Sequence, residues 1–289
     1  MKGIILAGGS GTRLYPITKI VNKQMLPIYG KPMIYYPIST LIKCGINEIL
    51  IISGPNDICK YEELLEDGSQ WGCSFTYEIQ DEPNGIAEAF IIGKDFIGKD
   101  NVAIILGDNI FHGIDYKKII KNINNNFKGG LIFGYEVNDP ERYGVVSFDA
   151  KKNVIDIKEK PENPKSNYAV PGLYFYDNKV LEYINQITPS HRGELEITDI
   201  NNCYLIDKTL KVHLLNEGVA WLDTGTIDAY QQACQYIQVI EERQGIIIGS
   251  PEESAFKLKF INKEQLSILI SPLLKSGYGQ KLKKLIKSK

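Results

Sequence analysis

A regular alternation of short apolar runs with segments of helical pattern occupies the first half of the chain and constrains its fold most. Strands are predicted at residues 4–7, 49–53, 75–79 and 102–106, and helices at 33–43, 61–65 and 86–92. Each apolar run has the length of a buried strand, and helical segments separate the runs. This rhythm predicts an α/β fold with a Rossmann-like, doubly wound sheet that is mostly parallel in this half.

The pattern changes after Gly130. Strand candidates follow closely at 131–137, 145–148, 154–158 and 169–176, a spacing that favours mixed or antiparallel pairing. A long helix is predicted between Thr226, a suitable N-cap, and Gly245, a suitable C-cap. Residues 251–289 are expected to form shorter helices, with the basic segment 281–289 as a frayed tail. Because no linker composition divides the chain, residues 1–289 are expected to form a single domain.

The bulk composition argues against several kinds of partner. The formal net charge of -2 gives no field that would attract nucleic acid or an anionic membrane, so we expect neither, and phosphate would need a local site. The five cysteines are scattered without paired spacing, which favours a reduced compartment and a cytoplasmic location. The first apolar run is too short for a signal peptide or a membrane span and is expected to be a buried strand.

A glycine-rich turn follows the first predicted strand, in the segment Leu6-Ala7-Gly8-Gly9-Ser10-Gly11-Thr12-Arg13-Leu14. Glycine tolerates positive φ and lets backbone N–H groups approach phosphate oxygens, although a tight turn that binds nothing is equally compatible with the glycines alone. Two cations, Arg13 and Lys23, favour phosphate binding. The P-loop pattern is absent, and a dinucleotide fingerprint fails at Leu14, where glycine or alanine is required.

Two aspartates are candidates for a metal site. Asp108 lies just beyond the predicted strand 102–106, and ligands of open α/β sheets bind outside the carboxyl ends of strands. A carboxylate there suits Mg²⁺, which takes one or two carboxylates together with phosphate oxygens and water. Asp223 is the second candidate. Each aspartate could instead cap a helix or stabilise a turn, so the residues alone leave both alternatives open.

Several segments together resemble the sugar-1-phosphate nucleotidyltransferase family, and within it the branch that uses dTTP. The resemblance rests on residues 6–14 and on Lys23-Gln24-Met25-Leu26-Pro27, Leu106-Gly107-Asp108-Asn109, Asp139-Pro140-Glu141-Arg142-Tyr143-Gly144, Glu159-Lys160-Pro161, Arg192-Gly193-Glu194-Leu195 and Trp221-Leu222-Asp223-Thr224-Gly225. It spans essentially the whole chain. It implies a nucleotide-binding half at 1–130, a smaller antiparallel sugar-binding half at 131–225 and a helical C-terminal region at 226–289.

The resemblance also assigns residues to each substrate. It makes Arg13, Lys23, Asp108 and Asp223 catalytic, with Asp108 and Asp223 as ligands of Mg²⁺. The nucleotide-binding residues that it implies are Leu6, Gly8, Gly9, Gly11, Thr12, Arg13, Gln24, Gln80, Pro83, Gly85, Leu106 and Asp108. The sugar-phosphate-binding residues that it implies are Asn109, Tyr143, Gly144, Glu159, Lys160, Val170, Gly172, Tyr174, Arg192, Glu194 and Trp221.

The reaction that the resemblance implies joins dTTP and α-D-glucose 1-phosphate into dTDP-glucose and pyrophosphate with Mg²⁺. This is the first step of dTDP-sugar synthesis of the dTDP-L-rhamnose type. The resemblance further implies a homotetramer and feedback inhibition by dTDP-sugars. Two alternatives stay open: a related transferase that uses UTP or GTP, and a non-catalytic nucleotide-sugar sensor with the same fold. The joint presence of Arg13, Lys23, Asp108 and Asp223 argues against the sensor, which needs no leaving-group apparatus.

Overall fold

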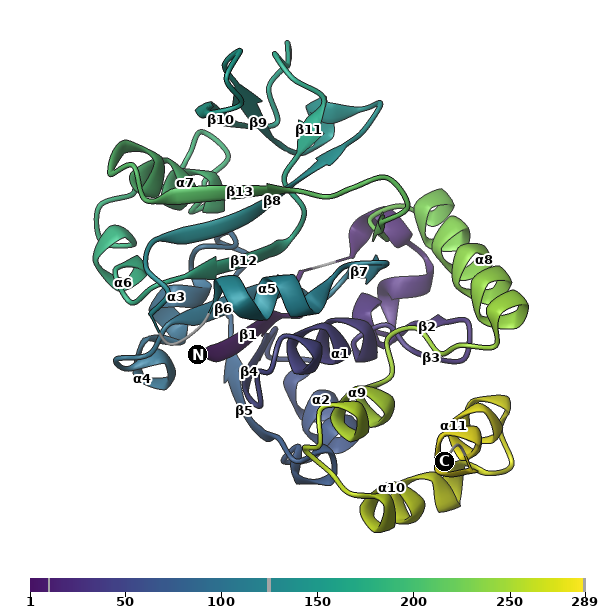
Figure 1. The fold of residues 1–289 in the computed structure, drawn as a ribbon. Coiled ribbons are helices and arrows are strands. Elements are labelled where there is room, and N and C mark those ends of the chain that lie inside the picture. The colour runs from purple at the N-terminus through teal and green to yellow at the C-terminus, as the bar shows by residue number, and fades with distance from the viewer. Residues whose placement is uncertain (10, 124–125, 288–289) are drawn as a thin grey trace.

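A large mixed sheet forms the centre of the computed structural model, which describes residues 1–289 except 10, 124–125 and 288–289. Its strand order is β10-β9-β11-β8-β12-β6-β1-β4-β5, and β13 pairs with β8 beside this path (Figure 1). The parallel half contains β1 (Lys2–Leu6), β4 (Glu48–Ser53), β5 (Ser74–Ile79) and β6 (Val102–Leu106). All four predicted strands of this half are confirmed, and β6 begins and ends at the predicted residues.

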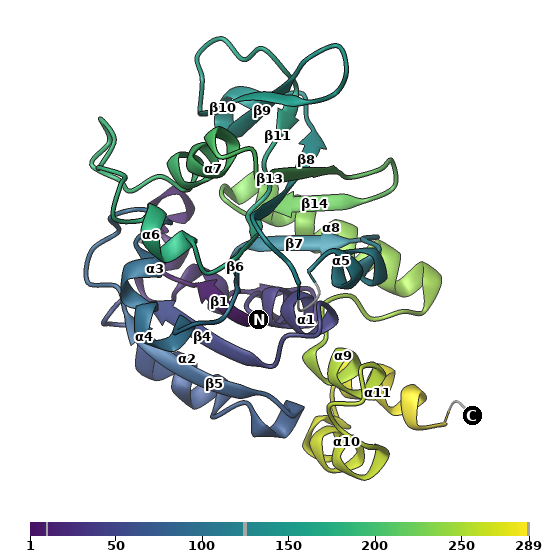
Figure 2. The same ribbon diagram turned by 60° about the vertical axis from the view of Figure 1, so that its left-hand side comes forward.

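Helices cover both faces of the sheet, because successive side chains of each strand point to opposite sides. In β1, Ile4 faces one hydrophobic core and Ile5 faces the other, and both are fully buried. The first core is covered by α3 (Ala89–Ile92), α4 (Lys94–Ile97), α6 (Val180–Tyr183) and α7 (Ile197–Ile206). The second is covered by α1 (Tyr35–Lys43), α2 (Ile58–Leu65) and α5 (Tyr116–Asn122). Figure 2 shows α3, α4 and α6 on one side of the central strands and α1 and α5 on the other, so the predicted doubly wound architecture is confirmed.

The remaining strands of the sheet make its second half largely antiparallel. They are β8 (Gly130–Glu136), β9 (Gly144–Phe148), β10 (Val154–Glu159), β11 (Tyr168–Ala169), β12 (Leu173–Tyr176) and β13 (Leu210–Leu214). Only β13 runs parallel to its partner, β8. Both ribbon views place β9, β10 and β11 at the end of the molecule opposite the C-terminal helices. The predicted change from parallel to mixed pairing is therefore confirmed.

The single strand predicted at 169–176 is wrong, because the chain leaves the ladder at Val170, Pro171 and Gly172. Pro171 has no N–H to donate, and the N–H of Gly172 donates to the Asn109 Oδ1 (3.0 Å) instead of to a strand. β11 consequently pairs with β8 and β9, whereas β12 pairs with β6 and β8. The break places Val170 and Gly172 beside the ends of the central strands.

Two small ribbons and a long helix border the carboxyl edge of the central strands. β7 (Asn109–His112) pairs with β14 (Ala220–Asp223), and β2 (Pro27–Ile28) pairs with β3 (Lys31–Pro32). α8 (Ile227–Gln244) follows β14, and the Thr226 Oγ1 accepts a hydrogen bond from the Ala229 N–H at 3.2 Å. Gly245 ends α8 with a φ of 68°. Both predicted caps are confirmed. The helix predicted at 86–92 begins later, at Ala89, because the N–H groups of Ala89 and Phe90 donate to carbonyls three residues back, as in a turn, and not four.

The C-terminal region forms α9 (Pro251–Lys257), α10 (Lys263–Ile270) and α11 (Gly277–Lys287). The prediction of a frayed tail at 281–289 is wrong for 281–287. Leu282 is fully buried, and the Lys281 Nζ lies 2.7 Å from the Glu241 Oε2, so packing and an ion pair hold α11 in place. Residues 288–289 lie outside the described part of the chain. Among the described residues, no helix is both long and apolar enough to cross a membrane.

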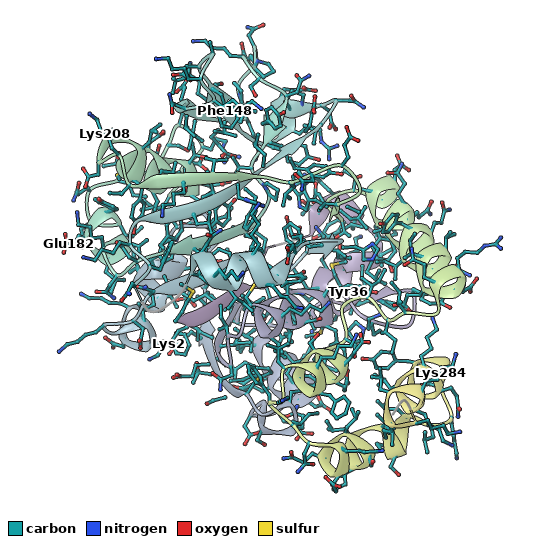
Figure 3. All side chains as sticks on the ribbon, viewed as in Figure 1. Lys2, Tyr36, Phe148, Glu182, Lys208 and Lys284 are labelled. Carbon is teal, nitrogen blue, oxygen red and sulfur yellow. The ribbon has the colours of Figure 1, made fainter. Side chains whose placement is uncertain are left out.

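A buried charge cluster joins the β2–β3 ribbon to α8 and α11. The side chains of Lys31 and Glu241 are 1% and 2% exposed, and the Lys31 Nζ lies 3.0 Å from the Glu241 Oε1. The Lys31 Nζ also lies 4.7 Å from the ring centre of Tyr36, which is labelled in Figure 3. Burial alone raises the pKa of Glu241, but the charges of Lys31 and Lys281 and the N–H of Ile248 lower it below its ordinary value. In a buried ion-pair cluster of this kind, removal of one member leaves a charge of the others unpaired and destabilises the folded protein.

We predict that Glu241→Gln lowers the free energy of unfolding by about 3 kcal/mol, because it leaves two buried or half-buried lysines without their shared carboxylate. Urea unfolding measures the loss. Because the folded pKa of Glu241 lies below its ordinary value of 4.5, the difference between wild type and variant should be largest above that pH and shrink as pH falls below it. The exposed neighbour Glu242 is the control, and a loss of the same size in Glu242→Gln would contradict the prediction.

Candidate active site

The loops that carry the predicted catalytic residues leave the sheet at the same edge. β1 and β6 are parallel, with Leu6 opposite Leu106, so the residues that follow both strands emerge side by side. Asp108 lies in the turn after β6. The Lys23 Nζ lies 2.5 Å from the Asp108 Oδ2, and the side chain of Lys23 is 9% exposed. The structure thus brings together two of the four predicted catalytic residues as a close, largely buried ion pair.

The pairing of β7 with β14 places Asp223 beside this ion pair. Asp223 lies opposite Asn109, the residue that follows Asp108. The Thr224 Oγ1 donates to the backbone carbonyl of Asp108 at 3.0 Å and ties the two segments together. The predicted pair of acidic residues therefore lies on neighbouring strands, although their positions are separated by more than a hundred residues in the sequence.

The two carboxylates have opposite pKa shifts. Burial alone raises the pKa of Asp108, but the charge and hydrogen bond of Lys23, with a hydrogen bond from Asn109, lower it below its ordinary value. The pKa of Asp223 is raised, first by burial and then by the negative charge of Asp108, and the charges of Lys23 and Arg142 offset this only in part. Repulsion between two adjacent hard oxygen donors is the condition that a divalent cation relieves.

Arg142 is a site residue that the sequence analysis missed. Its Nη2 lies 3.6 Å from the Asp223 Oδ2, and its Nη1 lies 2.6 Å from the Asp139 Oδ2. Its guanidinium carbon lies 5.2 Å from the ring centre of Tyr143. The available signal was its position directly before Tyr143 in a segment that carried the family resemblance.

The glycine-rich turn presents unused backbone donors. Gly9 and Gly11 have φ values of 103° and 57°, a region that favours glycine. Within the described residues, no hydrogen bond is formed by the backbone N–H groups of Gly8, Gly9, Gly11, Thr12 and Arg13. A run of free N–H groups of this kind binds anions. The exposed Arg13 guanidinium has no ion-pair partner in the described chain, so it adds a free cation to the turn.

Two cavities meet at Arg13 and Asp108. The first, the loop cavity, has a volume of about 330 Å³ and includes Gly8, Gly9, Gly11, Thr12, Lys23, Gln24 and Pro83 among its lining residues. The second, the strand cavity, has a volume of about 220 Å³ and includes Leu106, Asn109, Tyr143, Gly144, Glu159, Lys160, Val170, Gly172, Tyr174, Trp221 and Asp223. Most predicted nucleotide-binding residues therefore line one cavity and most predicted sugar-binding residues line the other.

Four predicted nucleotide-binding residues, Leu6, Gln80, Gly85 and Leu106, do not line the loop cavity. The carbonyl of Leu6 accepts the N–H of Gly107 at 2.9 Å. The Gln80 Nε2 donates to the Glu88 Oε2 (2.7 Å) and to the carbonyl of Gly85 (3.3 Å). Leu106 lines the strand cavity instead of the loop cavity. For these four residues a direct contact with nucleotide stays a prediction.

Gln24 presents an unpaired acceptor beside the turn. Its side chain is buried, and among the described residues its Oε1 has no hydrogen-bond partner. Buried polar atoms are usually hydrogen-bonded, so an unpaired one on a residue that lines a cavity makes that residue a candidate for a ligand contact. The predicted role of Gln24 in nucleotide binding agrees with this placement.

The strand cavity combines aromatic rings with a carboxylate. The rings of Tyr143 and Trp221 meet edge to face, with centres 5.0 Å apart. The Glu159 Oε2 accepts a hydrogen bond from the Thr198 Oγ1 at 2.7 Å, which fixes the carboxylate at the cavity wall. Lys160 adopts a φ of 39° directly before a proline, a strained conformation that places its side chain beside Glu159.

Asn109 supports the strand cavity through hydrogen bonds of both the oxygen and the nitrogen of its side-chain amide. Its Oδ1 accepts from the N–H of Gly172 (3.0 Å) and from the Trp221 Nε1 (2.6 Å). Its Nδ2 donates to the Asp108 Oδ1 at 2.9 Å. Asn109 was predicted to bind the sugar phosphate, and the structure shows it joining three parts of the site to one another.

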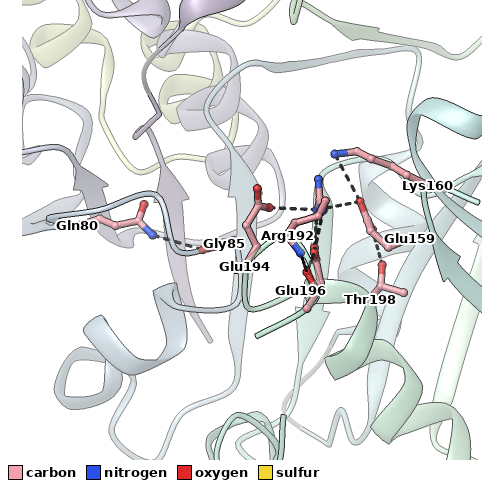
Figure 4. A network of polar contacts seen from close by, with 9 residues as sticks. Gln80, Gly85, Glu159, Lys160, Arg192, Glu194, Glu196 and Thr198 are labelled. Carbon is pink, nitrogen blue, oxygen red and sulfur yellow. Dashed lines mark hydrogen bonds and ion pairs between the residues drawn. The ribbon is translucent and has the colours of Figure 1, made fainter. Parts of the chain in front are cut away.

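Arg192 and Glu194, both predicted to bind sugar phosphate, lie outside the strand cavity. Figure 4 shows the Arg192 guanidinium between carboxylates, with its Nη2 2.8 Å from the Glu196 Oε1 and 3.1 Å from the Glu194 Oε2. The same nitrogen lies 3.8 Å from the Glu159 Oε1. Glu194 lines the loop cavity. Arg192 therefore reaches the strand cavity through Glu159 in this structure, and its contact with a phosphate stays a prediction.

Helix α7 contributes a face that the sequence analysis did not predict. Ile197, Thr198 and Asn201 on this helix line the strand cavity, and Ile86 lies with them. Residues three apart on a helix share a face, so the signal was present in the spacing of Thr198 and Asn201. It was missed because the segment 197–206 was not among the predicted helices.

The fold and these two cavities define a class: an α/β enzyme with two adjoining cavities at the carboxyl edge of its central strands. The chain belongs to the nucleotidyl transferase family, which matches residues 2–239. The family resemblance is thereby confirmed. The chain is 53% identical to glucose-1-phosphate thymidylyltransferase of Xanthomonas campestris pv. campestris (strain B100) over 286 residues, 99% of this chain and 97% of that protein. It is 49% identical to the protein of the same name from Neisseria meningitidis, over 99% of this chain and 100% of that one.

Solved structures show the same likeness. A Bacillus anthracis structure assigned as a glucose-1-phosphate thymidylyltransferase, in complex with sucrose, superposes with a TM-score of 0.76 at 45% identity, covering 82% of this chain and 94% of that one. UDP-glucose pyrophosphorylase complexed with UDP-glucose superposes with a TM-score of 0.72 at 26% identity, covering 82% and 98%.

We predict that Gly172→Ala destabilises the protein by about 1 to 3 kcal/mol. An added Cβ would lie 2.6 Å from the Leu106 Cδ1 and 2.9 Å from the Asn109 Oδ1, so one of these cavity-lining side chains must move. Urea unfolding measures the effect. Gly277→Ala is the matched control, because a Cβ there meets no atom within 4 Å, and equal destabilisation in both variants would refute the steric explanation.

Proposed function

We propose that this chain is a glucose-1-phosphate thymidylyltransferase. It transfers a deoxythymidylyl group from dTTP to α-D-glucose 1-phosphate, giving dTDP-glucose and pyrophosphate. One observation carries the proposal: a cavity with phosphate-binding amides and a cavity with aromatic and carboxylate walls share Arg13 and Asp108 at their junction. The names of the relatives, at about half identical residues over nearly the whole chain, support this choice of substrates.

The proposed reaction is an in-line displacement at phosphorus. An oxygen of the sugar phosphate forms a bond to the α-phosphorus of dTTP while the bond to the β-phosphate breaks, and pyrophosphate leaves. No general base is required, because the attacking phosphate oxygen is already ionised. Catalysis then consists of positioning and of charge neutralisation.

The residues of the loop cavity have the properties for the nucleotide half of this reaction. The free N–H groups of Gly8, Gly9, Gly11, Thr12 and Arg13 hold the phosphates of dTTP. Arg13, at the junction, stabilises the negative charge on the leaving pyrophosphate. Lys23 offsets the charge that develops at the α-phosphate, as a buried ammonium beside the reacting centre. The unpaired Oε1 of Gln24 accepts a hydrogen bond from the nucleotide, in keeping with the ring N–H that thymine offers.

The residues of the strand cavity have the properties for the sugar half. The Glu159 carboxylate, held by Thr198, accepts sugar hydroxyls. Tyr143 and Trp221 supply an apolar wall for the hexose ring. Lys160, which lines the same cavity, meets the 1-phosphate.

Asp108 and Asp223 fit a divalent cation of the Mg²⁺ type. They are adjacent carboxylates, and the charge of Asp108 contributes to the raised pKa of Asp223. Mg²⁺ uses one or two carboxylates and completes its shell with phosphate oxygens and water. When bound, Mg²⁺ polarises phosphate oxygens and neutralises their charge. Arg142 holds the Asp223 carboxylate from the other side and limits its movement.

The setting and the assembly belong to the same proposal. We place the enzyme in the cytoplasm, as a homotetramer under feedback inhibition by dTDP-sugars, at the first step of dTDP-sugar synthesis of the dTDP-L-rhamnose type. The five cysteines are free thiols, which agrees with a reducing compartment.

Purified protein should release pyrophosphate from dTTP and glucose 1-phosphate faster than from UTP, GTP, CTP or ATP with the same sugar. Lys23→Ala should lower kcat about a hundredfold or more, because it removes a cation at the reacting centre. Lys179→Ala is the control, since it removes a lysine from an exposed Lys–Asp pair. A preference for UTP or GTP would show that dTTP is the wrong nucleotide in the proposal. Absence of turnover with every pair would favour the alternative of a non-catalytic nucleotide-sugar sensor.

Chelation of divalent cations should abolish turnover, and added Mg²⁺ should restore it. Asp223→Asn should weaken Mg²⁺ binding to the enzyme–nucleotide complex about tenfold or more, because it removes one of two carboxylate ligands. Calorimetric titration of Mg²⁺ measures this without reference to activity. The exposed Asp228→Asn is the matched control. Unchanged Mg²⁺ affinity in Asp223→Asn would remove this residue from the metal site.

A further inference from the structure

The segment that carries Lys23 and Gln24 has little regular structure of its own. It is the three-residue 3₁₀ helix η3 (Lys23–Met25), and the described residues between β1 and η3 form no strand or α-helix. An isolated turn of this length is not stable by itself. Its position relative to the glycine-rich turn must therefore be fixed by contacts from outside the segment.

The side chain of Asn22 supplies several of those contacts. It is buried, and its Oδ1 accepts from the N–H of Gln24 at 3.0 Å and from the Tyr61 hydroxyl at 2.7 Å. Its Nδ2 donates to the Asp57 Oδ2 at 2.9 Å and to the carbonyl of Ala7 at 3.5 Å. Both hydrogens and two acceptor positions of the amide are used, so the group can occupy one orientation only.

The partners of Asn22 belong to the two loops that form the loop cavity and to the helix behind them. Ala7 is the residue directly before the glycine-rich turn, and Gln24 is the neighbour of Lys23. Tyr61 is fully buried on α2, and Asp57 lies at the start of that helix and pairs with Lys60 at 2.8 Å. The amide thus bridges the start of the phosphate-binding turn to the backbone of the catalytic segment.

Asn22 itself is absent from the lining of both cavities. It therefore has no direct route to a substrate, and its effect must pass through the groups that it holds. Small displacements of a positioned group reduce rates strongly, on the order of a hundredfold for about 1 Å. A buried amide that uses all its hydrogen-bonding capacity between two active-site loops is suited to prevent such displacement.

We propose that Asn22 is a positioning residue for the nucleotide half of the reaction, which fixes Lys23 and Gln24 relative to the glycine-rich turn through a hydrogen-bond network anchored on α2. The inference deepens the proposed function and rests on Lys23 acting at the nucleotide phosphates.

A double-mutant cycle between Asn22→Ala and Lys23→Ala tests the inference, with kcat and both KM values measured for the substrate pair that the wild type prefers. In the wild-type background, Asn22→Ala should lower kcat about ten- to a hundredfold. The KM for the sugar phosphate should change less than about twofold, because the strand cavity keeps its contacts. In the Lys23→Ala background, the loss of kcat from Asn22→Ala should fall below about threefold, because the group that Asn22 positions is gone.

Tyr61→Phe provides a second variant that removes one hydroxyl of the network and keeps the packing. It should lower kcat by about three- to tenfold and should also lose most of its effect in the Lys23→Ala background. Tyr204→Phe is the matched control, since it removes a buried phenol that donates to Asp177 at 2.8 Å, outside this network. If Asn22→Ala does not fold, the Tyr61→Phe cycle decides the question alone.

The inference is overturned if the losses of kcat are equal in both backgrounds, if kcat is unchanged, or if Tyr204→Phe lowers kcat as much as Tyr61→Phe. A merely structural role would lower the midpoint of unfolding without this non-additivity. Because the cycle uses whichever substrates the wild type turns over, a wrong choice of nucleotide in the proposed function leaves the test of Asn22 intact. A wild type that turns over no pair would refute the proposed function and this inference together.

Discussion

The parallel pairing of β1 with β6 is the constraint on which the rest of the site depends. Its register sets Leu6 opposite Leu106, and the N–H of Gly107 donates to the carbonyl of Leu6 at 2.9 Å. Two loops with different chemistry, one of free N–H groups and one ending in Asp108, consequently leave the sheet at one edge. Every other site residue is brought to this edge by a further pairing or packing contact.

At this edge each carboxylate is compensated by a neighbouring cation, and the net charge of the chain plays no part. Lys23 neutralises Asp108, and Arg142 approaches Asp223 at 3.6 Å. Leaving either carboxylate buried and alone would be costly, so each cation also stabilises the folded state. A second buried cluster, in which Lys31 pairs with Glu241, holds the β2–β3 ribbon on α8 by the same principle.

The sequence predicted the local features well, because strand runs and helix caps depend on neighbouring residues. The bounds of β6 and the caps of α8 are examples. It failed where long-range contacts decide the outcome. Burial of Leu282 and the pairing of Lys281 with Glu241 order the tail, and Gly172 leaves the ladder to bind Asn109. Arg142 was missed for the same reason, since only the fold brings it to Asp223.

The charge balance at the junction of the two cavities bears on how the two proposed phosphorylated substrates would bind to a chain with a small net charge. Arg13, Lys23 and Arg142 supply three positive charges, and Asp108, Asp223 and Asp139, the ion-pair partner of Arg142, supply three negative ones. These side chains therefore leave no positive excess for the several negative charges of a triphosphate beside a sugar phosphate. The free N–H groups of the glycine-rich turn reduce this deficit, and a divalent cation on the two carboxylates would remove most of the remainder. The proposal of a metal therefore rests on the number of charges that the two proposed phosphorylated substrates would bring to this edge.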